Sequence, residues 1–326
     1  MNKTLKIILN IFVFVLIAGF GYYMVHSIMS DKAIFSGGGN AEDTLVSPYK
    51  KTNSFTAASE ILCFDIYENM IYVALSGKIS VFNLSGKHQR DFAIKKNVRD
   101  IVIEESAIYL LYATGIEVFT TEGEKIAGWD ACSDNSDYCA FTVTDDYVFV
   151  TDAENKLITQ FDKQGQLVRF IKSPRGFVIP SYSFDIININ DTIFCSNSGR
   201  HKIESYTLDG KYIASFGATG TQAGAFAGCC NPVYLAATPW GDILTSEKGN
   251  PRISCYGRDG KFRTILLNSK MLGGGTQAYR AKMKDDKIYI AARKSLSVFV
   301  FDPELAAGSA CAGCPLNCPL RSSMKK

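Results

Sequence analysis

A short strand-like motif recurs six times in this chain, and its spacing restricts the possible folds more than any other feature. Each copy is a run of four residues beginning with isoleucine or valine, and the copies start at Ile71, Ile108, Val148, Ile193, Ile243 and Ile288. Successive copies are 37 to 50 residues apart. Repeats of this length are typical of architectures in which one unit cannot bury its apolar face alone. We therefore expect stacked or radially arranged units.

The local signals around the motif come in the same order in every unit. An apolar run such as 61–66 precedes the motif, a polar turn separates the two, and an alternating run such as Lys78–Asn83 follows. Most units then reach a turn glycine, at Gly86, Gly123, Gly165, Gly210 and Gly260. A last run such as Tyr212–Phe216 returns. Alternation between turn signals predicts strands, and four strands in each of six units predict an all-β, six-bladed β-propeller.

The sixth unit ends after its third strand, close to Asp302, and so lacks an outer strand of its own. The segment 52–57 precedes the first unit and has no partner within it. We predict that this segment supplies the missing outer strand of the sixth blade. Such a closure joins the two ends of the ring and removes the unpaired strand edge that an open ring would expose.

The middle units carry a longer pattern that leads from the motif through a short polar loop to an isoleucine, an aromatic residue and the turn glycine. It occupies 151–158, 196–203 and 246–253. This pattern resembles the NHL-repeat family, and the block Gly228-Cys-Cys-Asn-Pro232 resembles a variant found in some bacterial NHL-like propellers. The resemblance covers roughly residues 139–263. It implies an NHL/TolB-like six-bladed propeller, most often with a binding role, although some relatives are metal-dependent lyases or hydrolases.

Residues 7–29 form an almost uninterrupted apolar segment, preceded by Lys3 and Lys6 within residues 1–6. About 20 apolar residues are enough to cross a bilayer as a helix, and lysines before the segment favour a cytoplasmic N-terminus. We therefore predict a single transmembrane signal anchor at 7–29. The bulk of the chain would then lie outside the cytoplasm, in the periplasm if the source is a bacterium. A cleaved signal peptide is the alternative, although its apolar core is usually shorter.

The rest of the chain divides according to composition. Residues 30–48 are glycine-rich and typical of a flexible linker, residues 49–304 contain the propeller repeats, and residues 305–326 form a cysteine-rich tail.

The chain has 35 basic and 32 acidic residues, and this near balance gives no basic footprint for nucleic acid. The expected partners are therefore the membrane, through residues 7–29, and a protein or small molecule at one face of the propeller.

The tail carries the sharpest chemical motif, in which Cys311, Cys314 and Cys318 are followed by a proline. This spacing equals the last part of the bacterial ferredoxin motif, but the first cysteine of that motif is absent. Cys229 or Cys230 could supply the fourth ligand. An iron–sulfur cluster or another metal at these cysteines is therefore one interpretation of the motif. Disulfides in an oxidising compartment and a redox-active thiol set are the alternatives.

Two other cysteine pairs are close in sequence. Cys229 and Cys230 are adjacent, and both a ligand or redox role and structural pairing with each other or with other cysteines are open to them. Cys132 and Cys139 flank a polar loop between the second and third units, and we predict a disulfide between them.

Three oxygen-bearing residues follow the motif at equivalent places in neighbouring units: Asp152, Asn197 and Glu247. Equivalent positions of successive blades lie around one face of a propeller, so these residues are candidate ligands for a hard cation. The alternative is that each stabilises its own polar loop by hydrogen bonds to backbone N–H groups, as short polar side chains do in turns.

Four basic residues lie in loops of the third to sixth units and form a candidate anion-binding rim: Arg175, Lys248, Arg252 and Arg293. Solvated loop residues without a ligand are the alternative interpretation. The sequence contains no glycine-rich phosphate loop, nucleophile elbow or His-Glu-x-x-His motif, so we assign no catalytic residue.

Together these features predict a membrane-anchored, extracytoplasmic propeller that acts as a ligand- or protein-binding or scaffold module, with a redox or metal-bound cysteine cluster as a further element. Whether the protein is also an enzyme is left open. The alternatives are a metal-dependent propeller hydrolase or lyase, and an iron–sulfur electron-transfer protein.

Overall fold

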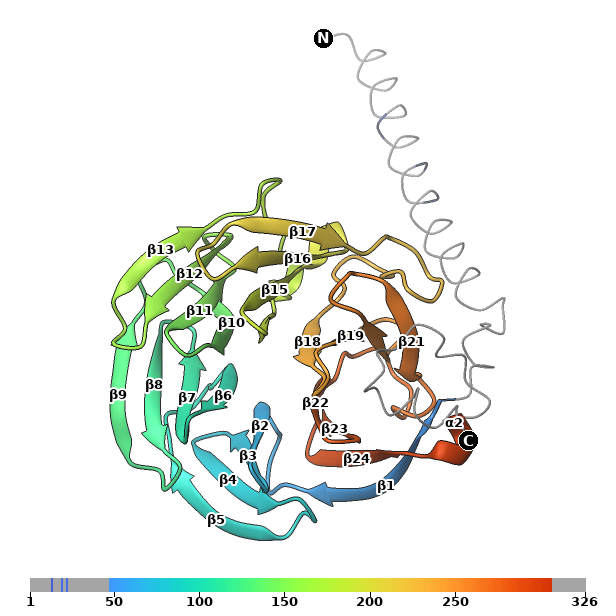
Figure 1. Cartoon of the computed structure of the whole chain (residues 1–326), viewed down its shortest axis with the longest axis horizontal. Helices are drawn as coiled ribbons and strands as arrows, with labels where there is room; N and C mark the ends of the chain where they lie inside the picture. The colour runs from blue at the N-terminus through green and yellow to red at the C-terminus, as the bar shows by residue number, and fades with distance from the viewer. Residues whose placement is uncertain (1–12, 14–18, 20–21, 23–46, 307–326) are drawn as a thin grey trace, which may run out of the picture. The chain divides into compact units, whose positions relative to one another are not determined.

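Six four-stranded antiparallel sheets form the blades of a closed ring (Figure 1). Five of them are each formed by one repeat unit, and the sixth combines three strands of the last unit with β1. The computed structural model describes residues 47–306, together with Val13, Gly19 and Tyr22. By its contacts the chain divides into two units, 1–44 and 45–326, and the second contains the propeller. The predicted six-bladed β-propeller is confirmed.

The first three blades are joined to one another by short connections, 94–99 and 131–137. Blade 1 contains β2 (Cys63–Tyr67), β3 (Met70–Leu75), β4 (Lys78–Asn83) and β5 (His88–Ala93). Blade 2 contains β6 (Asp100–Glu104), β7 (Ala107–Tyr112), β8 (Gly115–Thr120) and β9 (Lys125–Asp130). Blade 3 contains β10 (Tyr138–Val143), β11 (Tyr147–Asp152), β12 (Leu157–Asp162) and β13 (Leu167–Ile171).

The other three blades are joined by longer connections. Blade 4 contains β14 (Ile186–Ile189), β15 (Thr192–Asn197), β16 (Lys202–Thr207) and β17 (Tyr212–Phe216). Blade 5 contains β18 (Tyr234–Ala237), β19 (Ile243–Glu247), β20 (Arg252–Tyr256) and β21 (Phe262–Leu267). Blade 6 contains β22 (Arg280–Lys284), β23 (Lys287–Ala292), β24 (Ser295–Phe301) and β1 (Tyr49–Thr56). Short helical turns occur at η2 (Pro180–Tyr182), η3 (Ser198–Arg200) and α2 (Pro303–Ala306).

The sequence motif falls on the second strand of every blade, which has a hydrogen-bonded neighbour on both sides: β3, β7, β11, β15, β19 and β23. These strands are buried because blades stack face to face around the ring. Six apolar clusters result, and each is formed by two consecutive blades. Cys63, Cys195 and Cys255 are buried in these clusters as small apolar side chains.

The first strand along the chain closes the ring, as predicted. β1 pairs antiparallel with β24, from Tyr49 opposite Phe301 to Thr56 opposite Ser295. The strand begins earlier than the predicted segment 52–57, because Tyr49 is 1% exposed and packs edge-on against Phe301, with ring centroids 5.8 Å apart.

The turn glycines also connect neighbouring blades. Gly123, between β8 and β9, has φ +96°, a conformation that favours glycine. A Cβ atom at this position would lie 2.4 Å from the Phe92 ring of the preceding blade. A Cβ atom at Gly165 would likewise lie 2.6 Å from the Trp129 ring of the preceding blade. An aromatic side chain of one outer strand therefore packs directly on the turn backbone of the next blade.

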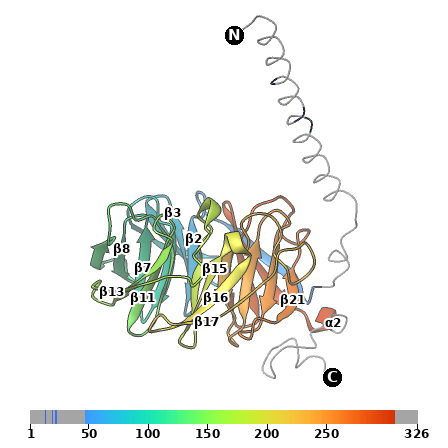
Figure 2. The same cartoon turned by 90° about the horizontal axis from the view of Figure 1, so that it is seen from above.

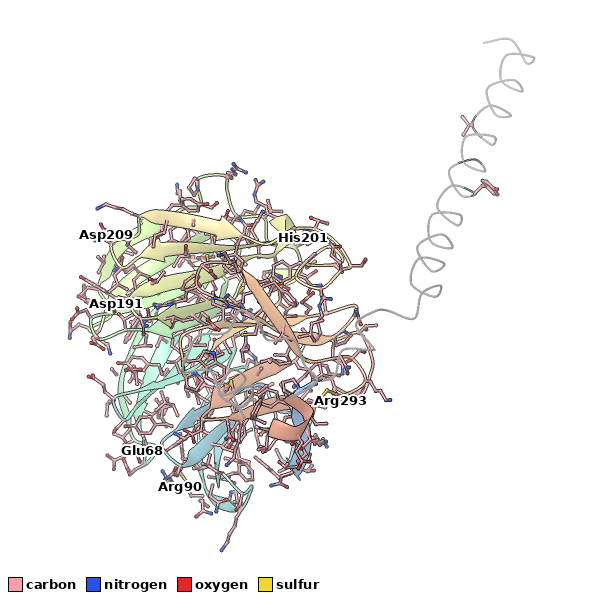
Figure 3. All side chains as sticks on the ribbon, turned by 45° about the vertical axis from the view of Figure 1, so that its right-hand side comes forward. Glu68, Arg90, Asp191, His201, Asp209 and Arg293 are labelled. Atoms are coloured by element: carbon pink, nitrogen blue, oxygen red, sulfur yellow. The ribbon has the colours of Figure 1, made fainter. Side chains whose placement is uncertain are left out.

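The two ends of the ring carry different connections. One end, which we call the loop face, carries the connections between blades and the turns between second and third strands. The opposite end carries the short turns between first and second strands and between third and fourth strands. Figure 2 shows the blades from the side. In Figure 3, His201 and Arg293 lie toward the loop face, whereas Glu68 and Asp191 lie on turns at the opposite end.

Several predictions fall on residues that the structure does not describe. The predicted transmembrane segment 7–29 is outside the described residues except for Val13, Gly19 and Tyr22, and most of 30–48 and 305–326 is outside them too. Among the residues that are described, no helix is both long and apolar enough to span a bilayer. The anchor, the linker and the tail therefore stay predictions.

The closing strand gives the first test. Replacing Tyr49 by alanine empties a fully buried site between blades 5 and 6, and we expect it to lower the free energy of unfolding by about 3–5 kcal/mol. Lys51→Ala, in the same strand but exposed, is the control and should change it by less than about 0.5 kcal/mol. Urea unfolding followed by tryptophan fluorescence measures both. Equal stability of the two variants would contradict a buried role for β1.

Candidate functional site

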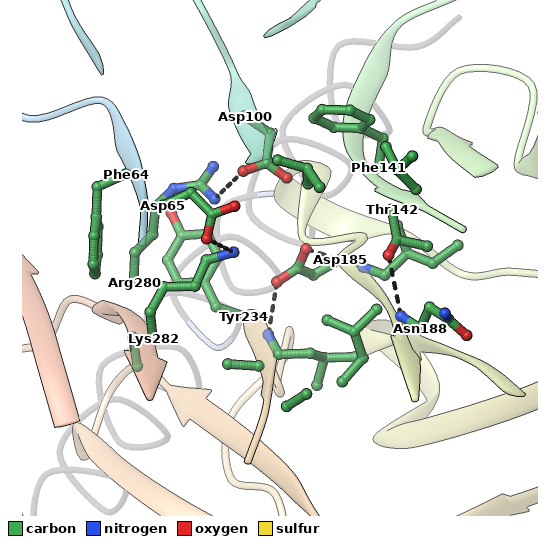
Figure 4. Close-up of a pocket in the computed structure, with 18 of the residues that line it drawn as sticks. Phe64, Asp65, Asp100, Phe141, Thr142, Asp185, Asn188, Tyr234, Arg280 and Lys282 are labelled. Carbon is green, nitrogen blue, oxygen red and sulfur yellow. Dashed lines mark hydrogen bonds and ion pairs between the residues drawn. The ribbon is translucent and has the colours of Figure 1, made fainter. Parts of the chain in front are cut away.

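A cavity of about 300 Å³ lies at the centre of the ring and is lined by the first strands of all six blades (Figure 4). The lining combines apolar residues that are partly exposed, such as Ile66, Val102 and Met283, with six charged ones. The charged residues are Asp65, Asp100, Glu104, Asp185, Arg280 and Lys282. Successive side chains of a first strand point to opposite faces of its blade, and they line the channel because the first strand is the innermost strand of each blade.

Arg280, at the start of β22, reaches across the channel to blade 2. Its Nη1 lies 3.0 Å from the Asp100 carboxylate, and its Nη2 donates to the backbone carbonyl of Arg99 at 2.6 Å. The guanidinium group also lies over the ring of Tyr234, 4.7 Å from its centroid. This contact set connects blades 2, 5 and 6 and fixes the position of the guanidinium.

Lys282, two residues further along β22, pairs with Asp65 of blade 1 at 3.1 Å. The other oxygen of that carboxylate accepts a hydrogen bond from the backbone N–H of Ile103 at 2.8 Å. Burial alone would lower the pKa of Lys282, but the negative charges of Asp65 and Asp100 outweigh it and raise this pKa. The lysine is therefore charged at neutral pH.

Asp185, just before β14, is the cavity carboxylic acid in the most unusual environment. Its two oxygens accept hydrogen bonds from the backbone N–H groups of Leu235, at 2.6 Å, and Ile186, at 2.9 Å. Within the described part of the chain it forms no salt bridge. Burial, followed by the negative charge of Asp100, raises the pKa of Asp185 to about 6, and the charge of Arg280 only partly opposes this.

The cavity therefore carries an excess of negative charge when its acids are ionised. Four acidic side chains line it but only two basic ones. Arg280 and Lys282 each form an ion pair with a different acid. Asp185 and Glu104 therefore account for the excess negative charge of the cavity. A concave, partly apolar space with a few convergent polar groups is the usual form of a small-molecule site.

Two further cavities open on the loop-face side and share Tyr234 and Arg280 with the central one. One, of about 430 Å³, is lined by Glu60, Gln277 and Arg293 among others. The other, of about 100 Å³, includes Cys139 and Ser181 and reaches Asp185. The stacked Arg280 and Tyr234 side chains thus lie where the three cavities meet.

The three predicted metal ligands do not gather at one site but stabilise the loops of their own blades. All three are at most 1% exposed. Asp152 accepts hydrogen bonds from Asn155 and from the backbone N–H of Asp137. Asn197 bonds to the backbone of loop 176–178 and to Glu204. In the described part of the chain, no group of three histidine, cysteine or acidic residues is arranged to hold a metal ion.

Glu247, the third of these residues, binds Arg252 of the predicted basic rim. The Nε of Arg252 lies 2.8 Å from a Glu247 carboxylate oxygen, and both side chains are 2% exposed. The other rim residues are dispersed: Arg175 is exposed on the β13–β14 connection, Lys248 lies beside Cys230, and Arg293 lines the loop-face cavity. The four residues therefore do not form one continuous rim.

The described cysteines are all free thiols. The predicted disulfide between Cys132 and Cys139 is not formed, and burial raises the pKa of the Cys139 thiol to about 12. Cys229 and Cys230 have their sulfur atoms 2.8 Å apart. Cys311, Cys314 and Cys318 lie outside the described residues, so the cluster proposed for them stays a prediction.

The residues around the central cavity were missed by the sequence analysis, although a signal for them exists. An Asp-Ile pair recurs at the first strand of units one, two and four, at Asp65, Asp100 and Asp185. Arg280 and Lys282 are charged residues with a spacing of two in the equivalent strand of unit six. Such positions face the channel, and the pattern could have identified them.

No protein-family model matches the sequence, and none of the curated protein sequences matches it either. The structure defines the chain as a six-bladed β-propeller. It is similar to virginiamycin B lyase from Staphylococcus aureus, with a TM-score of 0.53, 14% identity, and coverage of 77% of this chain and 99% of that one.

Two other solved structures show the same likeness. A streptogramin B lyase has a TM-score of 0.58 and 14% identity over 78% of this chain and 98% of its own. The Pan2 WD40 domain from Neurospora crassa has a TM-score of 0.53 and 7% identity over 78% and 95%. At these identities the similarity concerns the fold alone.

The raised pKa of Asp185 predicts a pH dependence of stability. Because the folded protein binds this proton more tightly than the unfolded chain, whose aspartates titrate near pH 3.9, the contribution is complete below about pH 4 and is lost as the pH rises through about 6. In the parent protein, the free energy of unfolding should therefore decrease by about 2–3 kcal/mol between about pH 4 and 7 because of this group, and we expect Asp185→Asn to abolish that decrease.

Asp209→Asn is the matched control. Asp209 is an exposed turn residue whose pKa is lowered to about 2 by Lys211 and Thr207, so its titration lies outside this pH window. Urea unfolding at several pH values measures the slopes. An Asp185→Asn slope equal to that of the parent protein would show that this carboxyl group does not titrate in the window.

Proposed function

We propose that this protein is a binding module whose propeller holds a small organic cation in its central cavity, with Asp185 as the main recognition group. The observation that carries the proposal is a carboxyl group at 6% exposure that lines the cavity and has no basic salt-bridge partner in the described residues. Asp100 and Asp65, by contrast, are paired with Arg280 and Lys282. A cationic ligand would supply the missing counter-charge.

The composition of the cavity favours an organic cation. Partly exposed apolar residues such as Ile66, Val102 and Met283 line the cavity beside the acidic groups, which suits the carbon skeleton of an amine. A hard metal ion would instead require several converging oxygen ligands. The volume of about 300 Å³ is at the lower end of the range for small-molecule pockets.

The NHL-like pattern of blades 3 to 5 supports a binding role, and we propose that these blades belong to that repeat class. The lyases among the similar structures share the fold alone with this chain, at 14% identity, so we do not propose their reaction for it.

We also propose that residues 7–29 anchor the module in a membrane and that the propeller lies outside the cytoplasm. The support is the apolar composition of this segment and the lysines that precede it, Lys3 and Lys6. A linker at 30–48 would separate the binding module from the bilayer.

Binding of n-butylammonium, with neutral n-butanol of nearly the same shape as comparison, tests the ligand class. We expect isothermal titration calorimetry to detect only the cation, and Asp185→Asn to weaken its binding at least about tenfold. Asp209→Asn should leave the affinity unchanged. Affinity should also fall below about pH 6, because a proton then competes for Asp185. Equal binding of both compounds, or normal affinity in Asp185→Asn, would contradict the proposal.

Alkaline carbonate extraction of membranes tests the anchor. We expect the full chain to stay in the membrane pellet and a variant lacking residues 2–29 to be released. Release of the full-length chain with the segment intact would refute anchoring. An N-terminus that begins after residue 29 in the mature protein would instead identify a cleaved signal peptide.

A further inference from the structure

The connection between β17 and β18 places two thiols side by side on the loop face. The sulfur atoms of Cys229 and Cys230 are 2.8 Å apart. Cys229 is exposed, whereas Cys230 is 0% exposed. The sulfur of Cys230 also lies 3.7 Å from the hydroxyl oxygen of Ser181. One sulfur is therefore accessible to reagents in solution, and the other contacts only the first sulfur and the protein interior.

Asn231 holds this thiol pair against the β19–β20 turn. Its amide nitrogen donates to the backbone carbonyls of Ala227, at 2.6 Å, and Lys248, at 2.9 Å. Its amide oxygen accepts from the backbone N–H of Lys248, also at 2.9 Å. Since Asn231 is 1% exposed, this clamp fixes the distance between the thiols and the lysine.

The electrostatic environment differs between the two sulfurs. Burial alone would raise the pKa of Cys230, but hydrogen bonds from Cys229 and Ser181 and the positive charge of Lys248 outweigh it and lower this pKa. The pKa of Cys229 is raised, mainly through its hydrogen bond to Cys230. Thiolate character therefore collects on the buried sulfur, which is the one placed to attack its neighbour.

A disulfide between adjacent residues is strained and easily reduced. Consecutive Cα atoms are about 3.8 Å apart, whereas disulfides usually join Cα atoms separated by about 4.4–6.8 Å. Strained or exposed disulfides have higher reduction potentials than structural disulfides, and are therefore reduced more easily. A ring at this position would form when an oxidant is present and open again when thiols are in excess.

We propose that Cys229 and Cys230 form a reversible thiol–disulfide site that reacts with small disulfides such as oxidised glutathione. Cys229 first loses its proton to the solvent, its thiolate attacks one sulfur of the small disulfide, and the first glutathione leaves as a thiolate that takes up a proton from the solvent. The Cys230 thiolate then attacks the Cys229 sulfur and displaces the second glutathione. Two electrons pass from the pair to the small disulfide, which is released as two thiols. This site is independent of the proposed ligand of the central cavity.

Peptide mapping of the full chain after treatment with oxidised glutathione tests the site. Free thiols are alkylated before digestion, because the chain contains other cysteines. We expect one peptide with an internal disulfide between Cys229 and Cys230, and its reopening by excess reduced glutathione. Two alkylated cysteines in that peptide after treatment, or a link from Cys229 to Cys132, Cys139 or a tail cysteine, would overturn the proposal.

Single cysteine variants test the separate roles of Cys229, which reacts with the small disulfide, and Cys230, which displaces the bound glutathione. Cys230→Ser should stop at one glutathione on Cys229, because no second thiol is present to displace it. Cys229→Ser should leave Cys230 unmodified, since that sulfur is buried. If both thiols instead react independently, each single variant will carry one glutathione, and the sequential mechanism is wrong.

Lys248→Gln keeps both cysteines and tests the placement of the charge. We expect ring closure to slow by about threefold to tenfold near neutral pH, because the buried thiol then ionises less readily. Lys261→Gln removes an exposed lysine of the β20–β21 turn at the opposite end of the ring and should not change the rate. Equal rates in the two lysine variants would exclude a role for Lys248.

Discussion

The burial of each blade against its two neighbours is the interaction on which this structure depends. The six apolar clusters each join consecutive blades. A blade outside the ring would leave both faces in water, at a cost of roughly 25 cal/mol for each Å² of exposed apolar surface. The contacts of Phe92 on Gly123 and of Trp129 on Gly165 extend this dependence to the outer strands. Because β1 completes blade 6, which packs against both blade 5 and blade 1, closure by β1 is needed to bury the apolar clusters on both sides of that blade.

The same geometry explains the chemistry of the channel. First strands from six blades converge there, and their inward side chains share a narrow space in which an unpaired charge is costly. Arg280 and Lys282 of blade 6 meet Asp100 and Asp65 of blades 2 and 1 in this space. Asp185 is stabilised by backbone N–H groups instead, which satisfy its oxygens without neutralising its charge. The channel thus combines a polar network with a carboxyl group, that of Asp185, whose pKa is raised by burial.

The sequence reveals the fold because the repeat period, strand alternation and turn glycines are local signals, and even β1 could be assigned from the missing strand of unit six. The site was harder to predict, since its residues come from distant strands that meet only in the closed ring. Asp152, Asn197 and Glu247 occupy equivalent positions as expected, but nearby backbone N–H groups, Glu204 and Arg252 are their partners. The pairing of cysteines likewise depends on distances between loops that sequence spacing does not contain.

The pairing of β1 with β24 also has a consequence for biosynthesis. A ribosome makes β1 before any other strand of the propeller and its partner, ending at Phe301, after all the others. The nascent chain must therefore carry an unpaired strand at its leading end until translation of the ring is complete. Contacts so distant in sequence form slowly, and a message that terminates early would yield a ring with two open edges. Such a product would be prone to pair with other chains through these edges.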